Sequence, residues 1–384
     1  MSVSCVKEVL ADLISFRTVS SESNLDCIAY VREFLEKCGA QIWIQKDETG
    51  KKANLLATVG PLVSGGVILS GHTDVVPVEG QTWFTDPWTT EERDGRIYGR
   101  GTTDMKGFLA AMLVTAANAS KRQLARPIHL AFSYDEELGC LGAWPLSQMI
   151  KDRLPDRPPI IVGEPTRSKV VTSHKGIVTF TTKVEGHSVH SSRVHEGVSA
   201  VTESARLIAW LDDHMYEQAR TNVSEVFDPP FTTIHCGMVS GGNAVNVVAA
   251  NCTFSTDVRT IEGRDPREYQ AAFERHVRDN VLPRIQAIRP DTQIIVTQKS
   301  FIPGFDPEPD SAAETVARQI TGDNETRTVA YSTEAGVFQK CGLVPVVCGP
   351  GDIAQAHQAN EYIEIAELER SFAVLGRLAD LQCS

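Results

Sequence analysis

The chain has 384 residues, of which 42% are hydrophobic and 22% charged, so we expect two folded domains rather than one core or a disordered protein. A formal net charge of −12 without any basic stripe argues against nucleic acid or an anionic membrane as a partner. Nine cysteines without a C-x-x-C pair are typical of reduced thiols in a cytoplasmic protein. Residues 1–16 form an amphipathic helical pattern rather than a signal peptide, and no stretch has membrane-spanning length.

The first 170 residues alternate between helical and strand patterns. The expected elements are helices near 4–16, 23–39 and 105–120, and strands near 40–46, 53–59, 66–71, 127–137 and 158–165. This alternation predicts an α/β sheet with helices on its faces.

From about residue 172 the order changes to strand, helix, strand, strand, helix, strand, which is the ferredoxin-like arrangement. After residue 299 an α/β pattern resumes and continues to the C-terminus. We therefore predict one α/β domain, formed by residues 1–171 and 300–384, that is interrupted by a small insert at residues 172–299.

The stretch "SGHTDVVP" places His72 and Asp74 two residues apart where an apolar run ends. This position is typical of a strand that opens into a loop, where open α/β sheets tend to bind ligands. Side chains two apart on an extended chain point the same way, so the pair can share one ion or contact each other. Alone, such a pair more often belongs to a turn or forms a loop hydrogen bond than binds a metal ion.

Four further segments place acids or an imidazole at strand ends and loops. They carry Asp104 in "GRGTTDMKG", Glu136 and Glu137 in "SYDEELG", Glu164 in "VGEPT" and His357 in "GPGDIAQAHQANEY". Each is ordinary by itself, as a helix cap, a solvated charge or a surface histidine. Together they predict a site at one edge of the sheet, and imidazole with carboxylate suits a cation such as Zn²⁺. The ligands are too many for one tetrahedral ion and fit two ions that share a carboxylate, and packing the acids together without cations would be unfavourable.

These motifs resemble those of the zinc metallopeptidase and deacylase family that includes acetylornithine deacetylase, succinyl-diaminopimelate desuccinylase, aminoacylase and glutamate carboxypeptidase. The similarity runs along the whole chain and includes "GHSVHSS" in the insert. It implies two Zn²⁺ ions, with Co²⁺ as a possible substitute. His72 and Glu164 would bind one ion. Glu137 and His357 would bind the other, and Asp104 would bridge the two.

The resemblance also implies the roles of two neighbouring acids. Asp74 would accept a hydrogen bond from the far ring nitrogen of His72 and fix its tautomer. Glu136 would be the general base that takes a proton from a metal-activated water. If Glu136 and Glu137 stand on a strand, they face opposite ways, so one binds metal while the other reaches the water.

In the insert, the resemblance assigns His190 to stabilising the tetrahedral oxyanion, often across a dimer interface. It thereby implies a lid and a homodimer formed through the insert. Asn246 and Arg259, each expected on a strand, would hold the carboxylate of the substrate, although relatives commonly have Pro where this chain has Ala249. The alternative for Arg259 is a surface salt bridge.

Within the family, "YSTEAGVF" and "GPGDIAQAHQANEY" look most like acetylornithine deacetylase. Gly336 would let the backbone approach the substrate carboxylate. We therefore predict a di-zinc hydrolase of N-acyl-L-amino acids, with N2-acetyl-L-ornithine of arginine biosynthesis as the first candidate. Relatives commonly have Pro and Asp where this chain has Ala359 and Asn360. The loss of this acid near the site predicts weaker selection for a cationic side chain.

Other functions stay open. The near alternative is a deacylase or carbamoylase of a different N-acyl or N-carbamoyl amino acid. A non-catalytic relative that binds amino acids or peptides is less compatible with an intact Glu136, since a binding module has no use for a base. A structural metal site is less compatible still, because such sites are usually closed by Cys and His.

Overall fold

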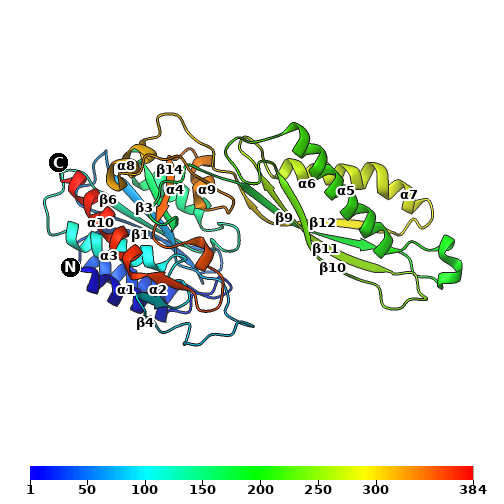
Figure 1. Ribbon diagram of the computed structural model, residues 1–384, viewed down its shortest axis with the longest axis horizontal. Helices are drawn as coiled ribbons and strands as arrows, with labels where there is room; N and C mark the ends of the chain where they lie inside the picture. The colour runs from blue at the N-terminus through cyan, green and yellow to red at the C-terminus, as the bar shows by residue number, and fades with distance from the viewer. Residues whose placement is uncertain (384) are drawn as a thin grey trace. The chain divides into compact units, whose positions relative to one another are not determined.

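The computed structural model describes residues 1–383. The chain folds into two compact units (Figure 1). The first unit comprises Met1–Thr172, Pro307–Arg327 and the chain from Thr333 onward, and the second comprises Ser173–Asp306 and Thr328–Ser332. The second unit thus extends beyond the predicted insert, which ended at residue 299. Strand β12 (Gln293–Ile302) continues past that point, and β13 (Thr328–Val329) returns to pair with β8 (Ser173–His174).

A six-stranded sheet in the order β1-β2-β6-β3-β7-β14 forms the centre of the first unit. Its strands are β1 (Gln41–Lys46), β2 (Ala53–Val59), β3 (Val67–His72), β6 (Ile128–Ser133), β7 (Ile160–Pro165) and β14 (Pro345–Gly349). Strand β3 runs parallel to β6 and β7, and β7 runs parallel to β14. The carboxyl ends of these four strands therefore meet at one edge of the sheet, where ligands bind in open α/β folds.

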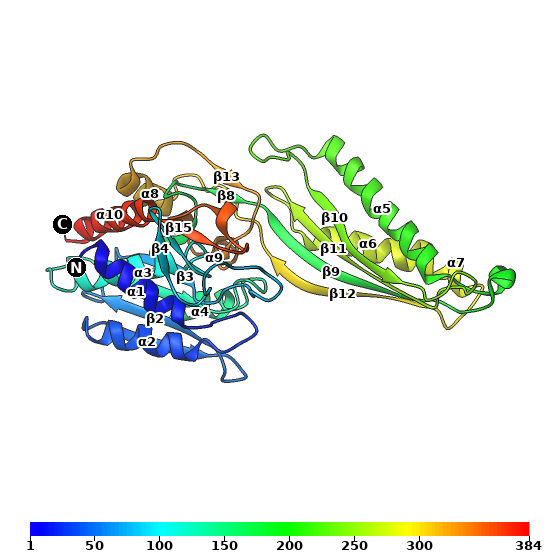
Figure 2. The same ribbon diagram turned by 60° about the horizontal axis from the view of Figure 1, so that its bottom comes forward.

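Strands β2, β3, β6, β7 and β14 are buried along their whole length, as expected for strands covered by helices on both faces. The helices are α1 (Val3–Ser15), α2 (Leu25–Glu36), α3 (Lys106–Ala119), α4 (Ala143–Arg153), α8 (Ala312–Thr321), α9 (Glu334–Lys340) and α10 (Ile365–Gln382). Helix α3 is apolar nearly all round because it lies between the sheet and helices α1 and α10 (Figure 2).

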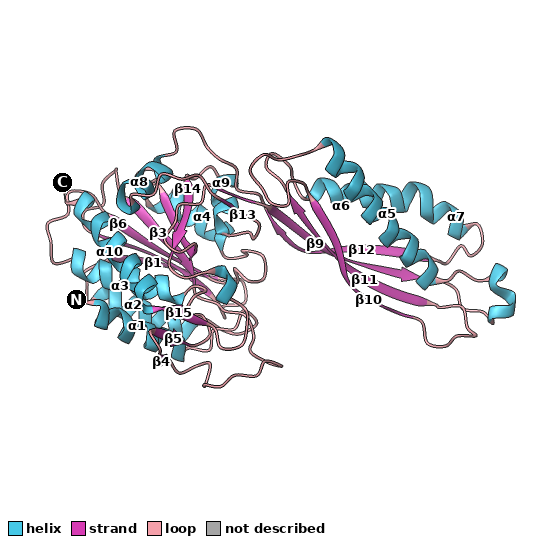
Figure 3. Cartoon of the chain, viewed as in Figure 1, coloured by secondary structure: helices cyan, strands magenta, loops and turns pink. Residues whose placement is uncertain are grey.

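The second unit is a four-stranded antiparallel sheet in the order β10-β11-β9-β12 (Figure 3). Its elements in chain order are β9 (Gly176–Glu185), α5 (Ala200–Thr221), β10 (Thr233–Gly241), β11 (Asn251–Thr260), α6 (Arg267–His276), a π-helical turn at Val277–Val281, α7 (Leu282–Gln286) and β12. This is the predicted ferredoxin-like order. A separate core that includes Phe180, Phe254 and Phe273 holds the helices on the sheet.

A small sheet of β4 (Glu91–Arg93), β5 (Arg96–Tyr98) and β15 (Tyr362–Glu364) joins two distant segments of the first unit. Tyr98 pairs with Tyr362, so the loop that precedes β15 is held beside the loop that follows β5. Among residues 1–383 no helix is both long enough and apolar enough to cross a membrane.

Candidate active site

The five predicted metal ligands converge at the carboxyl edge of the large sheet, within the first unit. His72 is the last residue of β3, and Glu164 lies on β7. Asp104 precedes α3, Glu137 lies in the turn after β6, and His357 lies in the loop before β15. Strand ends and short loops thus bring together residues that are up to 285 positions apart in the sequence.

Asp104 stands between the two histidines. Its Oδ1 lies 3.1 Å from Nε2 of His72, and its Oδ2 lies 3.2 Å from Nε2 of His357. Glu137 Oε1 is 3.0 Å from Nε2 of His357, whereas Glu164 Oε1 is 3.7 Å from Nε2 of His72. The arrangement therefore has two halves that share one carboxylate, as a two-metal site requires.

Ligand atoms gather within 4.8 Å of one another in two groups, one of His72, Asp104 and Glu137 and one of His72, Glu136 and Glu164. The second group contains Glu136, to which the family resemblance gives the role of general base rather than of metal ligand. Glu136 therefore lies within ligand distance of the same centre, which is the position from which a base can reach a water held there.

The charges and unpaired atoms of the site fit divalent metal. Oε1 of Glu164 is buried without a hydrogen-bond partner. Burial raises the pKa of Glu164 and of Glu136 well above the usual range, and neighbouring carboxylates add to both shifts. Such a cluster is unfavourable by itself and becomes favourable with bound cations. Two imidazoles with three or four carboxylates are a donor set that suits zinc-like ions.

Asp74 contacts His72, but not as predicted. Nδ1 of His72 is 2.9 Å from the backbone carbonyl oxygen of Asp74 and 3.6 Å from the Asp74 carboxylate, which is beyond hydrogen-bond length. The backbone carbonyl of Asp74 therefore accepts the Nδ1–H of His72 and fixes the His72 tautomer in which Nε2 is free to bind metal. The Asp74 carboxylate instead accepts hydrogen bonds from the backbone N–H groups of Glu136, at 3.1 Å, and Glu137, at 3.3 Å. It orients the turn that carries both glutamates.

Glu136 and Glu137 do not stand on a strand, which corrects the expected alternation of their side chains. Strand β6 ends at Ser133, and Asp135 has a left-handed backbone with φ of 53°. The chain then turns, and Sγ of Cys140 donates to Oε1 of Glu136 at 3.3 Å. The turn, rather than strand geometry, separates the roles of the two acids.

The predicted substrate residues of the second unit do not lie together. His190 is exposed, and its Nδ1 accepts a hydrogen bond from the Ser192 N–H at 3.2 Å. Asn246 lies in an exposed turn before β11, not on a strand, and its carbonyl accepts from the N–H of Ser191 at 3.0 Å. Arg259 is near the other end of β11, where Nε donates to Asp257 and Nη1 donates to the carbonyl of Ala330.

The length of β11 separates Asn246 from Arg259. An extended strand rises about 3.4 Å per residue, so the run from Asn251 to Arg259 alone spans roughly 27 Å. The two side chains of one chain therefore cannot grip the same carboxylate, contrary to the joint role expected for them.

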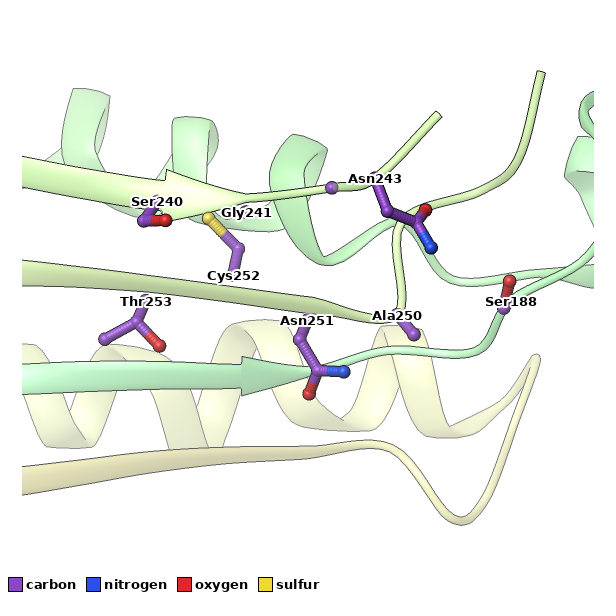
Figure 4. Close-up of a pocket in the computed structure, with 9 residues that line it drawn as sticks. Ser188, Ser240, Gly241, Asn243, Ala250, Asn251, Cys252 and Thr253 are labelled. Carbon is purple, nitrogen blue, oxygen red and sulfur yellow. The ribbon is translucent and has the colours of Figure 1, made fainter. Parts of the chain in front are cut away.

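An open pocket of about 300 Å³ lies where β10 ends and β11 begins (Figure 4). It is lined by Ser188, Ser240, Gly241, Gly242, Asn243, Ala250, Asn251, Cys252 and Thr253. None of these lining residues is charged, so this pocket is not the carboxylate site that was predicted for Arg259.

Sequence reasoning overlooked Glu334, two residues before Gly336. Both residues are buried in α9. Burial raises the pKa of Glu334 to about 7, although a hydrogen bond from the Ser133 hydroxyl and the charge of His72 favour the ionised form. The "YSTEAGVF" motif drew attention to the glycine, whose proposed contact with substrate stays a prediction, while the acid beside it was not considered.

Comparisons with known proteins show the family and the fold. Acetylornithine deacetylase of Myxococcus xanthus is 33% identical over 377 residues, which cover 97% of this chain and 96% of that protein. A metallo-carboxypeptidase of the M20 family from Sulfolobus solfataricus has the same fold, with a TM-score of 0.78 at 17% identity over 98% of this chain and 99% of that one. A dinuclear metal-binding peptidase of the M20 family from Bacillus subtilis gives a TM-score of 0.67 at 13% identity over 99% and 98% of the two chains. Residues 68–381 match the model of peptidase family M20/M25/M40, so this chain belongs to that family and is a metal-dependent amide hydrolase.

Proposed function

We propose that the chain hydrolyses the amide bond of an N-acyl-L-amino acid, with N2-acetyl-L-ornithine as the first candidate substrate and two Zn²⁺ ions as the cofactors. The observation that carries this proposal is the position of Asp104, whose two oxygens face two different histidines. The relatives named acetylornithine deacetylase, which are 32–33% identical over nearly the whole chain, support the choice of substrate.

Bound divalent metal would supply Lewis acidity, which lowers the pKa of water and polarises an amide carbonyl. His72, Asp104, Glu137, Glu164 and His357 would hold it. Glu136 would take the proton of the attacking water at its carboxylate and return it to the departing amine. The Asp74 carboxylate would keep Glu136 in place by accepting a hydrogen bond from the backbone N–H of Glu136.

A homodimer through the second unit forms part of this proposal. One chain places His190 and Asn246 at one end of the second unit's sheet and Arg259 at the other, so a single copy cannot gather them around one substrate. The edge strand β10 exposes Met238, at 72%, and Val239, at 64%, which gives a second copy an apolar strand to cover. Arg259 would grip the substrate carboxylate, and His190 of a second copy would stabilise the oxyanion.

A hydrolysis panel tests the substrate. N-acetyl, N-formyl, N-succinyl and N-carbamoyl amino acids, including N2-acetyl-L-ornithine, are each incubated with the enzyme loaded with zinc or with cobalt, and the free amine is measured. We expect the highest kcat/KM for N2-acetyl-L-ornithine. A clear preference for a carbamoyl substrate would instead identify the carbamoylase alternative.

The variant Glu136→Gln tests the assigned base. Because it keeps the shape of the side chain and removes the proton acceptor, we expect turnover to fall by about 10²–10⁴-fold. Metal content, measured by elemental analysis, should stay at the wild-type level. Turnover close to wild type would show that another group takes the proton.

A further inference from the structure

The backbone around Asp104 is fixed by a buried acid from a distant segment. Oε1 of Glu361 accepts hydrogen bonds from the N–H groups of Thr103, at 2.9 Å, and Asp104, at 3.1 Å. Glu361 is 1% exposed and lies four residues after His357. One side chain thus links the loop of one metal ligand to the segment that carries another.

Glu361 is paired with an equally buried cation. Its Oε2 is 2.7 Å from Nη1 of Arg100, and each side chain is 1% exposed. The same guanidinium donates from Nη2 to Oε1 of Gln81 at 2.6 Å. It also lies over the ring of Trp83, 5.2 Å from the ring centroid.

Gln81 completes the connection to His357. Its Nε2 donates to the backbone carbonyl oxygen of His357 at 2.9 Å. His357 has a left-handed backbone with φ of 63°, which a residue with a side chain rarely adopts without surrounding support. A continuous series of side-chain bonds through Glu361, Arg100 and Gln81 therefore runs from the backbone of Asp104 to the backbone of His357.

We propose that Gln81, Arg100 and Glu361 are positioning residues that hold Asp104 and His357 at the separation a second metal ion needs. The proposal rests on the metal-dependent function proposed above. Other interactions hold the opposite half of the site. His72 ends a buried strand and Glu164 lies on another, so the ladder of the sheet fixes them without this network. Asp104 would serve both ions, whereas His357 would serve only the second. Loss of the network at its His357 end should therefore weaken chiefly the metal bound by Glu137 and His357.

Two variants test the network. Gln81→Met keeps the size of a half-buried side chain and removes its three hydrogen bonds, to His357, Arg100 and Trp83. Glu361→Gln keeps an acceptor for the N–H groups and removes the charge that pairs with Arg100. The matched control is Gln358→Met in the same loop, whose side chain donates only to the carbonyl of Ala354. Each purified variant is stripped with chelator and titrated with Co²⁺, and the bound metal and the visible spectrum are recorded at each addition.

For the wild type and Gln358→Met we expect two Co²⁺ ions per chain. In Gln81→Met the second ion should bind about 10–100-fold more weakly, which is the usual effect of losing a residue that orients a metal ligand. The first ion should bind as in the wild type, with an unchanged spectrum. Glu361→Gln should show the same selective loss if it folds. Second-ion affinity within twofold of wild type in Gln81→Met, or equal weakening of both ions, would overturn the proposal.

These outcomes are separable from the substrate assignment because the titration uses no substrate. If Gln81→Met binds the second Co²⁺ ion as the wild type does, and the wild-type enzyme hydrolyses N-acyl amino acids, only the network proposal is wrong. If Gln81→Met binds the second ion selectively more weakly, and the wild type hydrolyses no N-acyl amino acid, the network proposal holds and the substrate assignment is wrong.

Discussion

At the scale of single residues, the convergence of the five proposed metal ligands could be predicted because each follows a recognisable strand or turn signal. The groups that hold the ligands could not be predicted. Arg100 and Glu361 are 261 positions apart, and nothing in either local segment indicates a buried ion pair. The structure also gives Asn360 a role that the sequence did not indicate. Its Oδ1 accepts a hydrogen bond from the N–H of Phe84 at 2.8 Å, so this side chain holds the loop that contains Phe84.

Glu334 provides a prediction about pH. Its pKa rises from 4.5 to about 7 on folding, so between these values the unfolded chain has lost a proton that the folded chain keeps. Stability therefore falls as the pH rises through this window. The full loss is about 3 kcal/mol at 1.36 kcal/mol per pH unit. In metal-free protein, Glu334→Gln should gain about that much relative to wild type between pH 4.5 and pH 8, measured by urea unfolding. A difference that does not change with pH would show that Glu334 is ionised in the folded protein.

Arg259 provides a prediction about substrate recognition. Its side chain is 38% exposed and already bonded to Asp257 and Ala330, which pre-orders the guanidinium for a carboxylate. Arg259→Ala should raise KM for N-acyl amino acids by about 10–100-fold, as the loss of a charged hydrogen bond implies. Substrates with an amidated carboxyl group provide the control and should change little. Equal losses on both substrates would count against carboxylate recognition.

At the scale of elements, the type and order of the main strands and helices could be read from apolar periodicity, whereas their ends could not. The strand expected over residues 127–137 stops at Ser133, because the left-handed backbone at Asp135 turns the chain. The second helix expected in the insert is divided into α6 and α7 by a π-helical turn at Val277–Val281. The three-residue strands β4, β5 and β15 are too short to give a pattern and exist only because they pair with one another.

Close packing of α3 on β7 gives a prediction at this scale. Gly163, next to Glu164, leaves room for the ring of Phe108, and a Cβ there would lie 2.0–2.4 Å from three ring atoms. Gly163→Ala must push the helix from the sheet and should cost at least 1–3 kcal/mol, as overpacking of cores typically does. The matched control is Gly376→Ala in α10, where a Cβ meets nothing within 4 Å and should stabilise the helix by about 1 kcal/mol. Thermal unfolding distinguishes the two variants. A Gly163→Ala protein as stable as the wild type would show that the Phe108 ring can move aside for an added methyl group.

At the scale of the whole molecule, the two units have separate cores, and all five proposed metal ligands belong to the first. Metal at 100 times its Kd stabilises the state that binds it by about 2.7 kcal/mol, and removal also restores repulsion among the clustered acids. Chelation should therefore increase hydrogen exchange in β3 and β7 of the first unit and leave β9 and β11 of the second unchanged, with reversal on adding zinc. Exchange in the second unit should instead fall with rising protein concentration if that unit forms the dimer. Equal effects of chelation on both units would mean that the cores unfold together, and the metal would then stabilise the chain as one cooperative body.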